Sequence, residues 1–253
     1  MIISKFPSGS GSGGVMPQIN YSGQYELALD SGGWHIKFLS SGTLQVLSAI
    51  GVDIFLVGGG GMGSDERWNV YDSSGHVYNY YGGGGGGGYT ETVKNKLMPG
   101  GSSYAVVVGN PGQASSITPS DATVWDGESY TANGGENGSR TAGGDGGSGG
   151  GGPAYYAWYS DSHGYYRGWQ ETEGGVDGAD GQTRHEQTGN GGEGQGTTTR
   201  EFGSGKLYAQ GGNATYAREY GQSYDAEPNT GNGGYGGIGG LGASGIVILR
   251  NAR

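Results

Sequence analysis

A run of seven consecutive glycines at residues 82–88 constrains this chain more than any other feature, and 63 of its 253 residues are glycine. Glycine loses more backbone freedom on folding than any other residue. A folded chain therefore keeps such a run only where a side chain would not fit or where the backbone stays mobile. Since glycine also serves where backbones must touch, as at the collagen axis, the run indicates either a flexible linker or a closely packed lattice.

Leu, Ile, Val and Phe make up about 15% of the chain and the formal net charge is −10, a balance that by itself favours disorder. Their distribution favours folding instead, because most of them fall in strand-sized segments near the two ends of the chain. Residues 109–245 contain only seven of them and 39 of the glycines. This middle region cannot build an ordinary hydrophobic core, so it must be solvated coil or be held by backbone hydrogen bonds.

Composition also narrows the class of protein. The absence of cysteine excludes disulfides and thiolate metal sites. No apolar run is long enough to span a membrane, and residues 1–7 lack the apolar region of a signal peptide. The acidic balance, with a pI near 4.7, argues against a nucleic-acid partner. We therefore expect a protein that is made in a cytoplasm, leaves by a route other than the usual secretory one, and has no membrane insertion.

Apolar segments bounded by turn residues predict strands. The expected strands are 24–29, 34–39, 43–47, 52–57, 89–94, 104–108 and 245–250, with further short strands at 124–125 and 130–132. No segment repeats apolar residues with helical spacing, so the expected fold class is all-β, a β-sandwich without significant α-helix. Residues 1–17 are expected to be a flexible tether or attachment segment, and residues 18–253 one glycine-rich domain. An engineered linker is the alternative for residues 8–14.

The glycine runs alternate with the predicted strands, and strand 245–250 closes the chain, which argues against a free linker. Long structureless loops are also rare inside compact domains. The alternative to disorder is a bundle of polyglycine II helices, which have about three residues per turn and no internal hydrogen bonds. Without Cβ atoms, neighbouring helices can pack closely and exchange N–H···O=C bonds. We therefore expect glycine-rich loops and a polyglycine II bundle beside the sandwich.

An ordered set of segments resembles a known family. Residues 42–61 read GTLQVLSAIGVDIFLVGGGG, followed by GGGGGGGYTETV, PGGSSYAVVVGNPG, YTANGGENG and finally GASGIVILR. Over residues 40–250 this set resembles the glycine-rich domain of phage and prophage tail-fibre and receptor-binding proteins. A similar domain occurs in the extracellular region of a family of vertebrate receptor tyrosine kinases. The resemblance implies a β-sandwich that supports glycine-rich loops or polyglycine helices and is used for binding.

The chain departs from the plain version of that family in two aromatic insertions, 64–81 and 153–173, which also contain Ser, Asp, Asn, Gly, His and Arg. Rigid amphipathic rings beside adaptable polar groups are typical of binding loops, and such rings also stack on sugar faces. The alternative is that the rings pack together and anchor loops that have no other apolar material. The candidate receptor-binding residues are Trp68, Tyr71, Tyr78, Tyr80, Tyr155, Tyr156, Trp158, Tyr159, Tyr165, Tyr166 and Trp169.

No motif supports catalysis. The four histidines are scattered, and no pair of them has metal-ligand spacing. Matches to G-x-G-x-x-G carry no weight in a chain so rich in glycine. Residues 143–149 and 174–181 are similar to the Gly-Asp turns of calcium-binding β-rolls but lack their repeat, so solvated turns are the preferred interpretation. We expect no enzyme activity, no catalytic residue, no cofactor and no metal.

The expected function is a virion tail-tip or tail-fibre adhesin that displays its aromatic loops to a host-surface glycan or protein. It would be made in the host cytoplasm and act outside the cell as part of the virion. Other virion tail proteins are expected partners, and a homotrimer is one expected assembly because fibre proteins are often trimers. The alternative is a structural baseplate or decoration protein. Ice binding by a flat polyglycine bundle is disfavoured because the G-x-x repeats are irregular.

Overall fold

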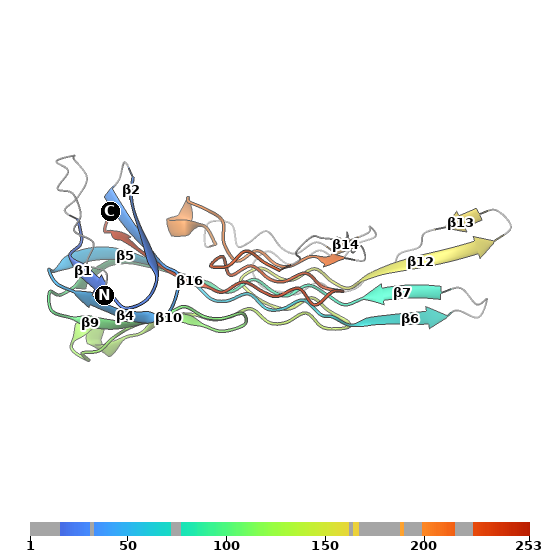
Figure 1. The fold of residues 1–253 in the computed structure, drawn as a ribbon, viewed down its shortest axis with the longest axis horizontal. Helices are drawn as coiled ribbons and strands as arrows, with labels where there is room; N and C mark the ends of the chain where they lie inside the picture. Colours follow the sequence, from blue (N-terminus) through green and yellow to red (C-terminus); the bar gives the residue numbers. More distant parts are fainter. Residues whose placement is uncertain are drawn as a thin grey trace.

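The protein is elongated, and three parts follow one another along its long axis: a β-sandwich, a bundle of extended glycine-rich segments, and a small separate sheet (Figure 1). The computed structural model describes residues 16–30, 33–71, 77–161, 164–166, 188–189, 199–215 and 225–253. Met16, the first of these residues, packs against the core of the sandwich, and the last strand of the chain lies inside the same sandwich. The two ends of the described chain are therefore both at the sandwich end of the molecule.

Two antiparallel five-stranded sheets form the sandwich in the described part of the chain. Sheet A has the strand order β1-β4-β9-β10-β11. Its strands are β1 (Ile19–Tyr21), β4 (Gly42–Val46), β9 (Ser103–Val107), β10 (Ser115–Pro119) and β11 (Tyr130–Ala132). Sheet B has the order β2-β3-β16-β5-β8. Its strands are β2 (Tyr25–Asp30), β3 (Gly33–Phe38), β16 (Ile246–Asn251), β5 (Ile50–Val57) and β8 (Thr90–Met98).

The hydrophobic core lies between these sheets, and strand alternation explains which residues enter it. In β4, Leu44 and Val46 are buried while their neighbours are not. In β5, residues 52–57 are all buried, because apolar clusters cover both faces of sheet B: Val52, Ile54 and Leu56 pack in one cluster and Phe55 and Val57 in the other. The main core cluster contains Trp34, Ile36, Phe38, Leu44, Val46, Val52, Ile54, Leu56, Met98, Tyr104, Val106, Ile117, Val247 and Leu249.

The all-β fold and the sandwich are confirmed, and the seven longer predicted strands are present with shifted ends. The strand predicted at 124–125 is wrong. Residues Val124–Gly127 form a short 3₁₀ helix, η1, in which Trp125 and Asp126 have positive φ angles and the Trp125 indole N–H donates to the Leu97 carbonyl. Strands β1 and β10 were not predicted, because each offers few large apolar residues.

The middle of the molecule is a glycine lattice, by which we mean segments 58–66, 82–89, 133–153, 208–214 and 229–245. At its centre runs the seven-glycine segment, residues 82–88, and all seven of these glycines are buried. Each of their N–H groups donates to a backbone oxygen of another segment at 2.8–3.0 Å. The glycine run is therefore lattice and not linker.

The hydrogen bonds of this central run repeat every third residue. The N–H groups of Gly85 and Gly88 donate to one neighbouring segment, at Gly234 and Gly231. In the same way, Gly83 and Gly86 donate to segment 136–139, and Gly84 and Gly87 donate to segment 148–151. Carbonyls of the run accept from segments 61–64 and 144–147 and from Gly212. A repeat of three with six surrounding neighbours is the arrangement of polyglycine II helices packed side by side, so the predicted bundle is present.

Close backbone contact explains why this segment must be glycine. A Cβ atom added at Gly84 would lie far inside the contact distance of the Gly212 carbonyl oxygen. A Cβ atom added at Gly87 would likewise collide with the backbone carbonyl of Ala209. Because these obstacles are main chain, and the Gly212 carbonyl itself accepts from the Gly151 N–H, no side-chain rotation can relieve them.

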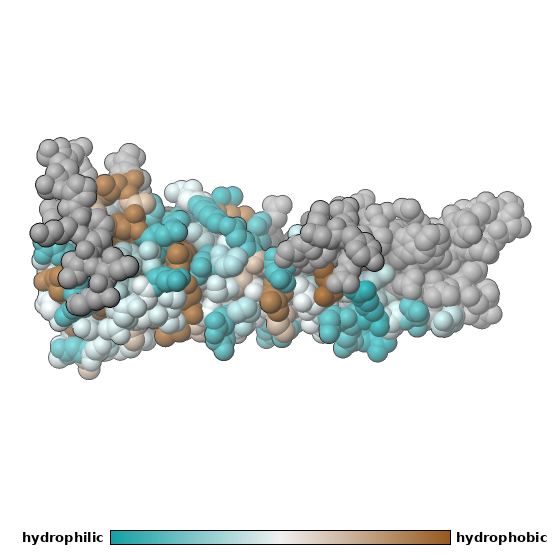
Figure 2. Space-filling model, in the orientation of Figure 1, coloured by the Kyte–Doolittle hydropathy of each residue, from teal (hydrophilic) through white to brown (hydrophobic). Residues whose placement is uncertain are grey.

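The outer segments of the lattice carry side chains with the same period of three. Between residues 232 and 244, the exposed or half-exposed positions with side chains are Asn232, Tyr235, Ile238, Leu241 and Ser244. The residues between them are glycine or alanine and are buried apart from Gly239. A helix with about three residues per turn presents every third residue to one side. On the face shown in Figure 2, the lattice is mostly hydrophilic or neutral, with only small separate apolar groups.

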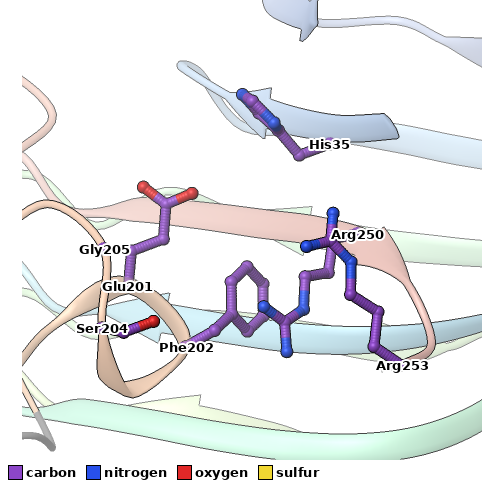
Figure 3. Close-up of a pocket in the computed structure, with 7 residues that line it drawn as sticks. All are labelled: His35, Glu201, Phe202, Ser204, Gly205, Arg250 and Arg253. Carbon is purple, nitrogen blue, oxygen red and sulfur yellow. The ribbon is translucent and has the colours of Figure 1, made fainter. Parts of the chain in front are cut away.

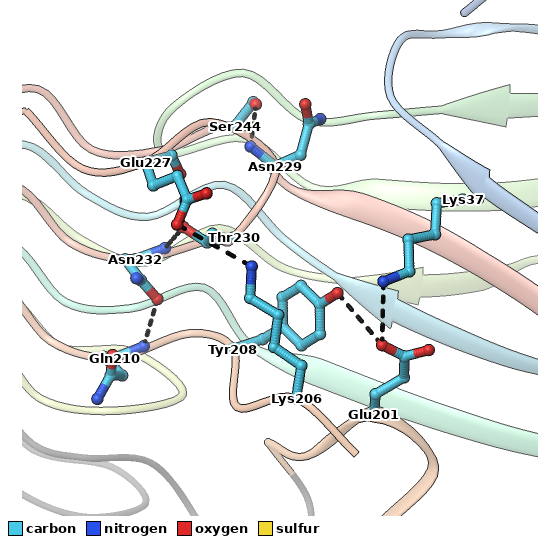
Figure 4. A network of polar contacts seen from close by, with 10 residues as sticks. All are labelled: Lys37, Glu201, Lys206, Tyr208, Gln210, Glu227, Asn229, Thr230, Asn232 and Ser244. Carbon is cyan, nitrogen blue, oxygen red and sulfur yellow. Dashed lines mark hydrogen bonds and ion pairs between the residues drawn. The ribbon is translucent and has the colours of Figure 1, made fainter. Parts of the chain in front are cut away.

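A segment that we call the cap, residues 199–209, covers the outer face of sheet B. It includes the short 3₁₀ helix η2 (Glu201–Gly203), and its Tyr208 ring packs 5.7 Å from the ring of Phe55. The Tyr208 hydroxyl donates to the Glu201 carboxylate, which pairs with Lys37 of β3 at 3.5 Å (Figure 4). Burial raises the pKa of Tyr208, and the charge of Glu201 raises it further. The cap thus gives sheet B a second, smaller apolar layer.

Asn229 joins the lattice to the sandwich. Its side-chain amide donates to the carbonyls of Leu39, just after β3, and Gly245, just before β16, both at 3.0 Å. Its backbone N–H donates to the Ser244 hydroxyl at 2.9 Å (Figure 4). One residue with a positive φ angle therefore ties the two ends of lattice segment 229–245 to each other and to sheet B.

Replacing Gly84 by alanine tests the lattice. Since the added methyl group collides with a fixed carbonyl, Gly84→Ala is expected to lower the free energy of unfolding by about 3 kcal/mol or more. The matched control is Gly51→Ala, where the nearest atom to the new Cβ is the Ala252 Cβ at 3.6 Å. Urea unfolding followed by circular dichroism measures both. Equal stability of the two variants would contradict close packing at Gly84.

Candidate functional site

The two aromatic insertions are not independent loops, because they pair with each other. They form a four-stranded antiparallel sheet of order β13-β12-β7-β6, which we call the tip sheet. Its strands are β6 (Arg67–Tyr71), β7 (Val77–Tyr81), β12 (Ala154–Asp161) and β13 (Gly164–Tyr166). The tip sheet lies at the end of the molecule opposite the sandwich (Figure 1). A further two-stranded pairing, β14 (Thr188–Gly189) with β15 (Ala214–Thr215), lies beside the lattice.

Lattice segments continue directly into three of the tip strands. Segment 58–66 leads into β6, β7 leads into the glycine run, and residues 142–153 lead into β12. At the junction, the Gly82 N–H donates to the Glu66 carbonyl at 3.0 Å, and the Arg67 Nε donates to the Gly237 carbonyl at 2.6 Å. The lattice therefore determines the positions at which these strands begin or end, and hydrogen bonding between the strands forms the sheet.

The register of the tip strands sorts the candidate residues onto two faces. Positions directly opposite each other in neighbouring antiparallel strands share a face, and successive positions alternate. Trp68, Tyr80 and Tyr155 form one such row across three strands. The face with this row, which we call the aromatic face, has the positions of Trp68, Val70, Tyr78, Tyr80, Tyr155, Ala157, Tyr159 and Tyr166.

The opposite face, which we call the mixed face, alternates aromatic with polar positions. One row across it contains Asn69, Asn79 and Tyr156, and the next contains Tyr71, Val77 and Trp158. The full set of its positions is Arg67, Asn69, Tyr71, Val77, Asn79, Tyr81, Ala154, Tyr156, Trp158, Ser160 and Tyr165. The sequence at these positions therefore combines aromatic residues with amides and an arginine, a composition typical of surfaces that bind polar ligands.

Side chains at the base of the aromatic face pack against each other. The rings of Trp68 and Tyr80 stack with centroids 5.0 Å apart and planes 13° apart. The guanidinium carbon of Arg140, from a lattice turn, lies 4.5 Å from the Trp68 ring centre. Its Nε is 4.0 Å from the Glu66 carboxylate, and both of these charged side chains are about half exposed. This cluster supports the packing alternative for Trp68 and Tyr80.

Tyr71 has the opposite character, because it is 67% exposed at the outer end of β6. Of the predicted site residues, ten lie in the four tip strands, and Trp169 lies outside the described residues. Sequence reasoning missed Arg67, Asn69, Asn79 and Arg140. The alternation of Tyr78, Tyr80 and of Tyr156, Trp158 along their segments was the signal that these insertions form strands.

The glycine- and aspartate-rich segment 143–149 is part of the lattice and not a solvated turn, since its Gly144 and Gly147 N–H groups donate to Gly84 and Gly87. The similar segment 174–181 lies outside the described residues. Within the described ranges, no three His, Asp or Glu side chains gather closely enough to hold a metal ion. Nor does any helix in these ranges have the length and apolar character needed to cross a membrane.

Comparison with known proteins places the chain in a family. The model of a family described as a glycine-rich domain matches residues 40–252. Because this match covers most of the chain, the protein belongs to that glycine-rich domain family. No curated protein and no solved structure matches it.

Paired cysteines test whether the two insertions form one sheet, and the chain has no native cysteine to interfere. Asn79 and Tyr156 are opposite each other in neighbouring strands, where Cα atoms are about 5 Å apart and a disulfide can form. Asn79→Cys with Tyr156→Cys is expected to cross-link under mild oxidation. Asn69→Cys with Tyr156→Cys is the control, because these positions are two strands and about 10 Å apart. Mass spectrometry of tryptic peptides measures both, and equal cross-linking would contradict the register.

Proposed function

We propose that this protein is an adhesin of a phage or prophage tail, which binds a host-surface glycan or protein through its tip sheet. The observation that carries the proposal is the gathering of two aromatic-rich insertions, far apart in sequence, into one sheet at the far end of the molecule. That end lies away from the sandwich, which holds both ends of the described chain. The arrangement suits a protein attached at one end and making contact at the other.

The glycine lattice supports the proposal through its stiffness. An extended polyglycine segment of seven residues is roughly 20 Å long, and here each N–H of that segment is hydrogen bonded to a neighbour. Such a spacer holds the tip sheet away from the sandwich and costs little freedom on binding, since it is already ordered. Under this proposal the protein acts by display, with no catalytic step, no cofactor and no metal.

The mixed face is the part of the tip sheet that we assign to the receptor. Its Tyr71 is exposed, and its positions combine rings with Asn69, Asn79 and Arg67. Rings can stack on the apolar faces of sugars or on protein side chains, while the amides donate and accept hydrogen bonds and the guanidinium group donates them. The base of the aromatic face is assigned to packing, because Trp68 and Tyr80 already contact each other.

That packing favours a second candidate function. Rings that stack on each other also suit a structural baseplate or decoration protein, in which the tip sheet would be buried against another virion protein. The tail-fibre resemblance supports both candidates, whereas the exposed Tyr71 favours the adhesin. In either case we propose that the protein is part of the virion, made in the host cytoplasm, with other tail proteins as partners. The same proposal includes assembly of the protein as a homotrimer.

Binding of purified, labelled protein to a panel of bacterial strains tests the adhesin. Wild type is expected to bind some strains saturably. Replacing Tyr71, Tyr156 and Trp158 by alanine is expected to weaken binding at least about thirtyfold, since the loss of even one ring anchor costs about 2 kcal/mol at an interface.

The matched control replaces Leu29 and Leu97, which are 68% and 60% exposed on the sandwich, by alanine. This control is expected to bind like wild type, and circular dichroism checks that all variants fold. Well-folded wild-type protein that binds no strain, yet is required for particle assembly, would support the structural role. Loss of folding in the tip variant alone would show that these rings are packing residues.

A further inference from the structure

Two charged side chains that line the cavity under the cap are already paired. The Arg250 guanidinium donates to the buried carboxylate of Asp53 at 2.8 Å, and its carbon lies 4.0 Å from the ring centre of Phe202 (Figure 3). Glu201 of the cap is 3.5 Å from Lys37 of β3. These contacts hold the cap on sheet B, so we assign the cavity to packing.

The tip sheet, by contrast, has an open edge. β6 is the outermost strand in the order β13-β12-β7-β6 and forms the lower border of the tip in Figure 1. Its five residues, Arg67–Tyr71, keep one register with β7 and include no proline or lysine. Bulges, prolines and lysines usually keep an edge strand from pairing with another chain. Edge strand β8 has such protection, since its register with β5 shifts between Val52 and Ile54 and the Trp125 indole donates to the Leu97 carbonyl.

The hydrogen bonds at the junction show which backbone groups of β6 point outward. The Gly82 N–H donates to the carbonyl of Glu66, just before β6, at 3.0 Å. Bonded and non-bonded positions alternate in an antiparallel pair, so the even-numbered residues of β6 exchange bonds with β7. The N–H and C=O groups of Arg67, Asn69 and Tyr71 therefore point away from the sheet. Among the described residues, none of these outward groups has a hydrogen-bond partner.

The same three residues belong to the mixed face, and their side chains are exposed. Outward groups on alternate residues repeat about every 7 Å along a strand. A second polypeptide in the extended conformation offers N–H and C=O groups at the same spacing. This pattern favours a polypeptide over a glycan, because a sugar offers hydroxyl groups and not this alternation. A strand added at β6 would also extend the mixed face.

The side chains of β6 differ between its two ends. Arg67, at the lattice end, is its one charged residue, and its guanidinium carbon lies 5.7 Å from the Tyr81 ring centre. Among the described residues Arg67 has no ion-pair partner, and the neighbouring Glu66 carboxylate is 4.0 Å from Arg140. At the outer end, Tyr71 is 67% exposed. A strand that pairs with β6 is therefore expected to carry an acidic residue opposite Arg67 and an apolar residue opposite Tyr71.

We propose that β6 binds an extended segment of a host-surface protein, which adds to the tip sheet as a further strand. Backbone hydrogen bonds to Arg67, Asn69 and Tyr71 hold the segment, while the side chains of the mixed face select its sequence. The inference rests on the proposed adhesin function and names protein, not glycan, as the class of receptor.

Pretreatment of the cells distinguishes the two classes of receptor. Cells of a strain that binds the labelled full-length protein are treated either with proteinase K, which removes surface proteins, or with sodium periodate, which oxidises sugars. Binding is expected to be lost after proteinase K and kept after periodate. Loss of binding after periodate, or full binding after proteinase K, would overturn the proposal.

A proline variant tests the backbone contact itself. Asn69→Pro removes one outward N–H and spares the bonds to β7, so it is expected to fold and to weaken binding at least about tenfold. Asn69→Ala keeps that N–H and is expected to bind several-fold more tightly than Asn69→Pro. Leu29→Pro is the matched control at the sandwich end and is expected to bind like wild type. The Leu29 N–H also points outward from an edge strand, because the Leu39 N–H donates to the Gln24 carbonyl and the same alternation follows.

The outcomes separate this inference from the adhesin proposal. Wild-type protein that binds no strain would remove both. Wild-type protein that binds, with Asn69→Pro binding equally well or weakened no more than Asn69→Ala, would overturn strand addition alone. Circular dichroism checks folding, and if Asn69→Pro does not fold, the pretreatment of the cells still decides.

Discussion

The backbone hydrogen bond between neighbouring glycine segments is the interaction on which the rest of this structure depends. One such bond contributes only about 1 kcal/mol net, but an unpaired buried amide costs more than that. The seven N–H groups of the central run, residues 82–88, donate to four of the six surrounding segments, and carbonyls of the run accept from segments 61–64 and 144–147 and from Gly212. Only glycine permits this approach, so the composition that would favour disorder in a solvated chain becomes the condition for order in a packed one.

The lattice also determines what the two ends of the molecule can do. At one end its segments run into the sandwich, where apolar strands and the cap bury the large aliphatic residues. At the other end they run into the tip strands, whose spacing follows from that of the lattice segments. The lattice, which has neither a hydrophobic core nor regular strand pairing, thus joins the sandwich to the tip sheet. Single side chains add hydrogen bonds at the two junctions, Asn229 at the sandwich and Arg67 at the tip sheet.

The sandwich and the lattice could be predicted from the sequence because each depends on patterns within short segments. The nearly continuous apolar run at 52–57, interrupted only by Asp53, is expected of a strand buried on both faces. The glycine runs alternate with predicted strands, which favoured a packed lattice over a free linker. The period of three between Asn232 and Ser244 was also readable and would have identified outer lattice segments. Strand β10 was missed because Ile117 is its one large apolar residue.

The tip sheet could not be derived in the same way. Strands β7 and β12 are separated in sequence by the glycine run, four strands of the sandwich and lattice segment 133–153, and no local pattern in either strand indicates that they pair. Their pairing depends on where the lattice segments end next to each other. The ten candidate residues in the tip strands lie together in one sheet, and their division between an aromatic and a mixed face required the register.

Amide hydrogen exchange of residues 82–88 is the most direct test of the central claim. If the lattice is the ordered core of the molecule, these seven amides exchange only through global unfolding, as slowly as those of the buried strand β5. The comparison is internal, because both segments are measured in one sample by mass spectrometry or magnetic resonance. Exchange of the glycine run at the rate of an unstructured peptide, with β5 still protected, would contradict the lattice and leave a sandwich with a flexible linker.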